Sequence, residues 1–390
     1  MKKYDFDEIV PRKGTNSLKY DALEKFFGSP DILPLWVADM DFKTPDFIVN
    51  AIKERAAHEI YGYTFNPESY FEAIIGWMKR RHSWDIQKEW ISFSPGVVAG
   101  LTIAVEAFSD PGDGVIVQPP VYFPFFDCVK GTGRTMIENP LMIENGRYTF
   151  DLEDLKSKIT ENTRLLLLCN PQNPGGMVWT QEELKALTDI CMEHNIMIIS
   201  DEIHSDLIYT GKKHIPLASI SEEVAQNCMI CMAPSKTFNV AGLASSLVII
   251  PNKRKFAAYE RKLGVGHLGM GNIFGSVALE AAYANGDEWL DQMLTYLWEN
   301  YQLLEKFIAD HLPRVKVMKP EATYLVWLDF RDYGMKNQEL SKFTTEQAKV
   351  ALNDGGRFGT GGDGWLRLNI GCPRSVLEKG LEKLAGAFSN

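Results

Sequence analysis

Five short runs in the middle of the chain consist almost entirely of apolar residues. They span residues 114–118, 164–169, 196–200, 229–233 and 246–250. A strand with one face in water alternates apolar and polar residues, whereas a strand covered on both faces is apolar throughout. The pattern therefore predicts five strands of a sheet with both faces buried.

Helical periodicity separates these runs. The clearest case is residues 180–195, where Thr180 is a good helix cap. The residues of one helix face follow at the expected spacing: Leu184, Leu187, Ile190, Cys191 and His194. Strands that alternate with helices indicate a mainly parallel sheet between two helical layers, which is an α/β fold.

The pattern changes after about residue 285. A long helical stretch at 288–311 precedes two apolar runs, 323–330 and 365–371, and an amphipathic helix closes the chain. We predict a large domain over 46–285. A smaller α+β domain combines 286–390 with residues 1–45, which are irregular in pattern and rich in proline and aspartate.

Composition narrows the classes of function. Apolar residues make up 45% of the chain, charged residues 24%, and the net charge is −10. These values suit a globular protein with a large core, and they argue against nucleic-acid binding, which needs a basic surface. The apolar runs have strand length and residues 1–10 lack an apolar segment, so we expect neither a membrane span nor an export signal.

The six cysteines form no regular framework. Cys228 and Cys231 make a CxxC pair, but they fall in an apolar strand, and no second pair accompanies them. We therefore expect no metal site. Free thiols suit a reducing compartment, and we expect a cytoplasmic protein.

Four polar segments stand where ligands bind in α/β sheets, beyond the carboxyl ends of strands or at the start of a helix. They are "SPGVV" (94–98), "CNPQNPGG" (169–176), "SDEIH" (200–204) and "APSKTFN" (233–239). Each alone has an ordinary structural explanation, and Lys236 alone could be an exposed lysine at a strand end. Together they predict one site.

The order of Asn173, Asp201 and Lys236, in "NPxNPxG", "DE" and "SK", resembles the pyridoxal 5'-phosphate (PLP) enzymes of the aspartate aminotransferase superfamily. The resemblance extends over essentially the whole chain. It implies fold type I, in which helices enclose a mainly parallel sheet of the seven-stranded type and a smaller α+β domain completes the chain. It also implies PLP as the cofactor.

The resemblance assigns a role to each motif residue. Lys236 binds the cofactor aldehyde covalently and later moves the substrate α-proton. Asp201 opposes the pyridine nitrogen, and Asn173 donates to the ring oxygen. The backbone amides of Val97 and Val98, in the first turn of a helix, hold the phosphate.

Three further residues carry roles from the family. Tyr122 matches the aromatic residue that stacks on the cofactor ring, with a core tyrosine as the alternative. Arg367 matches the arginine that binds the substrate α-carboxylate, with a surface ion pair as the alternative. Tyr63 matches the tyrosine that reaches a neighbouring active site, which implies a homodimer.

Some positions depart from typical aminotransferases. His204 replaces a tyrosine, and Ala233 and Ala244 replace a serine and an arginine that usually contact the phosphate. Phosphate contacts therefore cannot be transferred directly, and Ser235 and Thr237 are candidate hydroxyl donors. We include His204 and Ser235 among the cofactor-binding residues.

Within the superfamily the chain is most similar to the cystathionine β-lyase and cysteine-S-conjugate β-lyase branch, the MalY/PatB type. The matching segments include "PLWVADMDF" (34–42), "SDEIHSDL" (200–207) and "PSKTFN" (234–239). This resemblance implies α,β-elimination of L-cystathionine or related cysteine S-conjugates to pyruvate, ammonia and a thiol, which is homocysteine when the substrate is cystathionine.

Two alternatives stay open. The chain could be an aminotransferase that uses a 2-oxo acid acceptor, because both reactions begin with the same proton transfer. It could also keep the fold mainly to bind a partner. The joint presence of Lys236, Asp201, Asn173 and Arg367 argues against this last alternative, since partner binding requires none of them.

Overall fold

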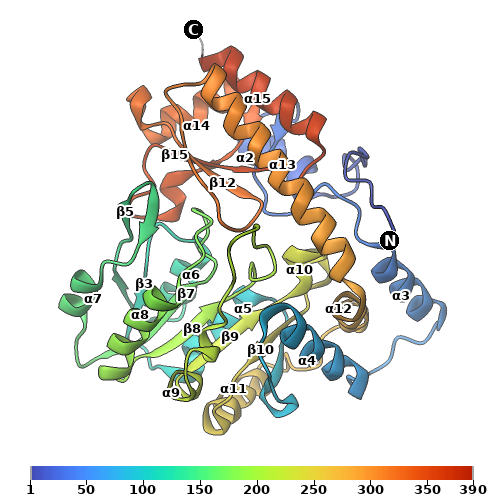
Figure 1. Cartoon of the computed structure of the whole chain (residues 1–390). Helices are drawn as coiled ribbons and strands as arrows, with labels where there is room; N and C mark the ends of the chain where they lie inside the picture. The colour runs from blue at the N-terminus through green and yellow to red at the C-terminus, as the bar shows by residue number, and fades with distance from the viewer. Residues whose placement is uncertain (1, 389–390) are drawn as a thin grey trace.

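A seven-stranded sheet lies at the centre of the larger part of the molecule (Figure 1). In spatial order its strands are β2 (Ile91–Ser94), β10 (Ser246–Ile249), β9 (Cys228–Met232), β8 (Met197–Asp201), β7 (Thr163–Cys169), β3 (Gly114–Val117) and β4 (Thr135–Glu138). The five strands from β9 to β4 are mutually parallel, whereas β10 runs antiparallel to both of its neighbours. The prediction of a mainly parallel α/β sheet is confirmed for residues 2–388, which the computed structural model describes.

Both faces of this sheet are covered, as the continuous apolar runs predicted. In β7, Leu165 and Leu167 belong to one buried cluster, and Leu166 and Leu168 belong to another. The first cluster includes residues of helices α5 (Val97–Phe108), α6 (Pro124–Lys130) and α11 (Lys253–Val265). The second includes residues of α4 (Glu68–His82), α7 (Leu152–Lys158), α8 (Gln181–Glu193), α9 (Glu222–Gln226) and α12 (Ile273–Asn285).

Helix α8 begins where the sequence predicted. The Thr180 hydroxyl accepts a hydrogen bond from the Glu183 amide at 3.2 Å, and the Glu183 carboxylate accepts one from the Thr180 amide at 2.8 Å. This reciprocal capping box satisfies two backbone donors that no intrahelical bond could satisfy.

A four-stranded antiparallel sheet forms the smaller part. Its order is β11 (Lys316–Met318), β12 (Leu325–Asp329), β15 (Trp365–Asn369) and β14 (Asn353–Asp354). Helices α14 (Asn337–Glu346) and α15 (Arg374–Phe388) belong to this part, and the long α13 (Asp287–His311) joins it to the larger part (Figure 1).

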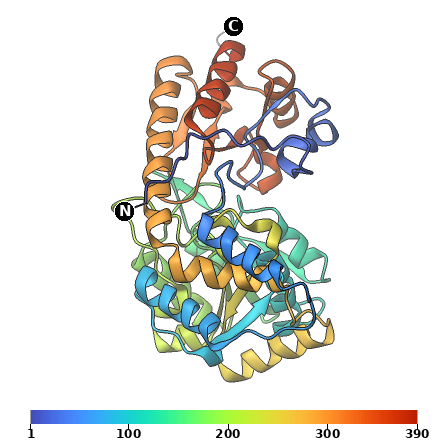
Figure 2. The ribbon, with the colours of Figure 1, turned by 90° about the vertical axis from the view of Figure 1, so that its right-hand side faces the viewer.

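The N-terminal segment lies beside the C-terminal elements (Figure 2). Strand β1 (Leu33–Pro34) pairs in parallel with β13 (Val350–Ala351). Chain segments far apart in sequence thus meet in this two-stranded sheet.

The remaining α-helices and strands are α1 (Leu18–Asp21), α2 (Leu23–Phe27), α3 (Asp46–Ala57), α10 (Pro234–Thr237) and the β5–β6 hairpin (Met142–Glu144 and Arg147–Thr149).

All six cysteines are buried free thiols. Cys228 and Cys231 pack into different core clusters, on opposite faces of β9, so their side chains do not converge. Across residues 2–388, every helix is either too short or too polar to cross a lipid bilayer.

Candidate active site

A cavity of about 200 Å³ lies where β7, β8 and β9 end. Because these strands are parallel, their carboxyl ends share one edge of the sheet, and the polar segments that follow them meet there. Eight of the predicted site residues line this cavity: Val97, Val98, Tyr122, Asn173, Asp201, His204, Ser235 and Lys236. Arg367 adjoins it through Asn173, and Tyr63 does not line it.

Lys236 projects from the one-turn helix α10 that follows β9. Its Nζ donates a hydrogen bond to the Ala38 carbonyl at 2.6 Å. Burial lowers the pKa of Lys236 to about 8, the charge of Arg367 acts in the same direction, and Asp39 and Asp201 oppose the shift. A substantial neutral fraction near neutral pH makes this amine a nucleophile and a base.

Asp201 ends β8 and is 4% exposed. One carboxylate oxygen accepts a hydrogen bond from the Ile203 amide at 3.1 Å, and the other has no partner among the described residues. Burial raises the pKa of Asp201 to about 7, although that amide and the charge of Lys236 lower it. A buried carboxylate with a free oxygen in a cavity suits a cationic or proton-donating ligand atom.

His204 lies in the same cavity, three residues beyond Asp201. Burial lowers its pKa to about 3, and the charges of Lys236 and Arg367 act in the same direction, so the ring is neutral. Its Nδ1 has no hydrogen-bond partner in the described part of the chain. His204 therefore offers the cavity a neutral imidazole.

Arg367 lies on β15 and is 3% exposed, which excludes the surface ion pair considered above. Its Nη1 donates to Asn173 Oδ1 at 2.9 Å, and its Nη2 donates to Asn353 Oδ1 at 2.6 Å. No carboxylate lies within ion-pair distance among residues 2–388, and burial lowers the pKa of Arg367 to about 10. A buried guanidinium held by neutral amides is arranged to receive an anion.

The far end of the cavity resembles a phosphate site without a cation. The start of α5 supplies Val97 and Val98, and Ala244 occupies the position of the usual arginine. Ser245 also lines this end, and its buried hydroxyl has no partner in the described residues. Sequence reasoning missed Ser245 because the family pattern marks position 244 and not 245.

The structure corrects the suggestion for Thr237. Its hydroxyl donates to Asp206 Oδ2 at 2.8 Å, and Thr237 does not line the cavity. The reason is geometric: Lys236 and Thr237 are consecutive residues of a helical turn, so their side chains diverge.

Residues 36–42, which we call the strap, pass beside the cavity, and Ala38 lines it. The Ala38 carbonyl accepts hydrogen bonds from Lys236 and from the Tyr324 hydroxyl, the latter at 3.0 Å. Asn239 holds the strap from the large sheet, since its side chain bonds the Met40 amide and carbonyl and the Phe42 carbonyl.

On its other side the strap is held by Asn369 on β15, which donates to the carbonyls of Val37 and Asp39 at 2.6 and 2.7 Å. Arg12 forms ion pairs with Asp39 and Asp41. The sequence gives no signal that Asn239 and Asn369 hold the strap or that Asn353 holds Arg367, because each contact forms only in the folded chain.

PLP fits the polar groups of this cavity. Lys236 offers an amine for the aldehyde, Asp201 offers a free buried oxygen for the ring nitrogen, and the start of α5 with Ser245 offers donors for the phosphate. The amide nitrogen of Asn173 stays available, because its oxygen is the atom that accepts from Arg367.

Comparisons with known proteins agree with this geometry. The family model for class I and II aminotransferases matches residues 30–384. The chain is 46% identical to cystathionine β-lyase PatB of Bacillus subtilis over 386 residues, with 99% of this chain and 100% of that protein covered. It is 33% identical to protein MalY of Escherichia coli over 388 residues, with 99% of each chain covered.

A solved structure supports the same family assignment. A PLP-bound protein from Clostridium difficile 630, provisionally assigned as an aminotransferase, superposes with a TM-score of 0.97 at 46% identity. The superposition covers 99% of this chain and 100% of that one. The resemblance inferred from the motifs is thus confirmed over the full length.

Proposed function

Because this chain belongs to the family of class I and II aminotransferases, and within it resembles PatB and MalY, we propose that it is a PLP-dependent carbon–sulfur β-lyase. It converts L-cystathionine or related cysteine S-conjugates to pyruvate, ammonia and a thiol. The observation that carries this proposal is the full-length similarity to cystathionine β-lyase PatB.

The cofactor-holding residues are Lys236, Asp201, Asn173, Tyr122 and His204, with Val97, Val98, Ser235 and Ser245 at the phosphate. Bound PLP supplies an electron-withdrawing ring that spreads the negative charge developed at the substrate α-carbon. Asp201 keeps a proton at the ring nitrogen, where a buried carboxylate stabilises positive charge.

Arg367 binds the α-carboxylate and Lys236 carries out the proton transfer. The two amide oxygens on Arg367 fix the plane of its guanidinium, so the substrate enters in one orientation. Neutral Lys236 takes the α-proton, and the electron pair of that C–H bond forms the Cα–Cβ double bond as the C–S bond breaks. The leaving thiolate takes a proton, and the enamine product tautomerises and hydrolyses to pyruvate and ammonia.

The direct test is pyruvate release from L-cystathionine by the PLP-loaded protein without any oxo acid. Pyruvate and free thiol in equal amounts are expected, and Lys236→Ala is the matched inactive control. Amino-group transfer that requires 2-oxoglutarate, with no pyruvate in its absence, would instead establish an aminotransferase. That second candidate is favoured by the family model and by the C. difficile structure.

We also propose a homodimer in which Tyr63 reaches the neighbouring cavity. Tyr63 is 93% exposed, and the adjacent Phe65 and Ile60 are 88% and 70% exposed, which is an unusual apolar surface for a lone chain. Light scattering should give twice the chain mass of 44.0 kDa. A monomer at assay concentration would contradict the proposal.

We further propose the domain division at residues 46–285 against 1–45 with 286–390. It is supported by the sheets, since all seven strands of the large sheet fall within 91–249 and the β1–β13 pair ties the N-terminal segment to the C-terminal part. The buried free thiols support a reducing location such as the cytoplasm.

A further inference from the structure

Arg357 is an exposed arginine whose charge meets no carboxylate in the described part of the chain. It lies in the 3-10 turn Gly355–Phe358 that precedes β15, with its guanidinium over the Phe123 ring at 4.3 Å from the centroid. Among residues 2–388 it forms no ion pair and no side-chain hydrogen bond, although the chain carries an excess of carboxylates. Its position is therefore fixed by an aromatic ring while its charge stays free.

Two rings connect this free guanidinium to the active-site guanidinium. Arg367 lies over Phe358 at 4.9 Å, Phe358 meets Phe123 edge-on at 6.1 Å, and Arg357 lies over Phe123. Phe123 also packs against Tyr122, which lines the cofactor cavity, at 5.1 Å. The two arginines are close enough that the charge of Arg357 contributes to the lowered pKa of Arg367.

A second cavity, of about 400 Å³, has Arg357 in its wall. Asn353 and Trp36 also line it, and both accept hydrogen bonds from Arg367 Nη2, at 2.6 and 3.3 Å. This cavity thus begins one side chain away from the proposed α-carboxylate site. Asp354 lies in the same wall as Arg357, so the cavity offers both signs of charge.

We propose that Arg357 binds a carboxylate on the leaving-group half of the substrate, which makes this chain selective for thioethers whose thiol half is itself an amino acid. The inference rests on the proposed lyase function and names the substrate class of that site. An extended thioether places five single bonds, about 6 Å, between its two α-carbons. A planar guanidinium recognises a carboxylate in two hydrogen bonds, and Asp354 suits the accompanying ammonium group.

The test compares L-cystathionine with S-ethyl-L-cysteine, whose leaving group is uncharged. Arg357→Gln should lower kcat/KM for L-cystathionine about tenfold to 100-fold, as expected for one charged hydrogen-bonding group. Its kcat/KM for S-ethyl-L-cysteine should stay within about twofold of the wild-type value. For L-cystathionine, the kcat/KM of Arg357→Lys should lie between those of the wild type and Arg357→Gln, because lysine keeps the charge and lacks the planar guanidinium.

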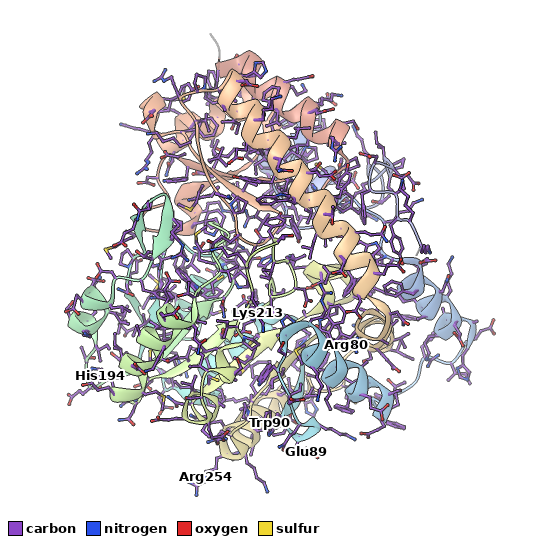
Figure 3. The ribbon with its side chains drawn as sticks, viewed as in Figure 1. Arg80, Glu89, Trp90, His194, Lys213 and Arg254 are labelled. Atoms are coloured by element: carbon purple, nitrogen blue, oxygen red, sulfur yellow. The ribbon has the colours of Figure 1, made fainter. Side chains whose placement is uncertain are left out.

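Arg254→Gln is the matched control, since Arg254 is exposed on α11 and projects from the outer edge of the molecule (Figure 3). This variant removes the same charge and should leave kcat/KM unchanged for both substrates. Calorimetry adds a readout without turnover: binding of 2,7-diaminosuberate, the carbon analogue of cystathionine, should weaken in Arg357→Gln, and binding of norleucine should not.

The outcomes separate the two proposals. If Arg357→Gln lowers kcat/KM equally for both substrates, or does not lower it for cystathionine, the role of Arg357 is overturned. The proposed lyase function would then still stand. Wild-type protein that cleaves S-ethyl-L-cysteine but not cystathionine would do the same. Failure of the wild type to release pyruvate from either substrate would overturn the lyase function, and with it the inference that rests on it.

Discussion

Lys236 is partly buried and has charges of both signs nearby, and this combination suits the two roles that we propose for it. In the proposed reaction it binds the cofactor and later accepts a proton. We expect Lys236→Ala to lower pyruvate release by at least about 10³-fold, because both covalent attachment and proton transfer depend on this amine. The visible absorbance of covalently bound PLP should also disappear. A variant that keeps this absorbance would contradict the assignment.

The pH dependence of cofactor uptake follows from the same lysine. The pKa of the free amine is about 8 and only the neutral amine attacks the PLP aldehyde, so binding of PLP to the apoprotein should slow as the pH drops below 8. The negative charge of Asp39 raises this pKa. Asp39→Asn should therefore shift the pH dependence of PLP uptake to lower pH, and a shift to higher pH would contradict this assignment.

At the residue scale, sequence reasoning found the groups that lie in contiguous motifs. Asp201 ends a strand, and Asn173 and Lys236 each come four residues after the end of one, so the sheet edge brings these residues together. Ser245, Asn239 and Asn353 were missed because their roles depend on contacts made across the folded chain. An asparagine in a loop has no pattern that reveals such a contact.

Among the elements, helix α10 needs an anchor because one turn of helix has little stability of its own. Asp206 supplies the anchor by accepting hydrogen bonds from Thr237 in α10 and from Trp77 and His82 in α4. Burial alone would raise the pKa of Asp206, but these bonds hold it below its ordinary value.

Asp206→Ala should therefore destabilise the protein by about 3–5 kcal/mol, because three buried donors lose their acceptor. Urea unfolding measures this change. Thr237→Val removes one of the three bonds and should cost only about 1 kcal/mol. Equal effects from the two variants would show that Asp206 does not act as a shared acceptor.

The strands were the elements best predicted from sequence. Each apolar run falls within two residues of an observed strand, because burial on both faces leaves a signal in every residue. The direction of β10 could not be predicted. Its apolar residues would suit either orientation, and only the hydrogen-bond register with β9 and β2 sets it.

For the whole molecule, the strap over the active site depends on both sheets at once. It is held by Asn239 on the side of the large sheet and by Asn369 on the side of the small one. Asn369→Ala should speed hydrogen exchange of the amides in residues 38–42 and raise KM, because the strap loses its two hydrogen bonds to the Asn369 side chain. Unchanged exchange would show that the other contacts of the strap hold it without Asn369.

The burial of the cysteine side chains determines how they respond to the thiols that a lyase reaction releases. All six thiols are buried, and burial raises the pKa of every one of them. Thiol–disulfide exchange requires an accessible thiolate. A catalyst that releases thiols at each turnover would thus keep its own sulfur atoms out of mixed disulfides and persulfides, and could accumulate product without covalent self-modification.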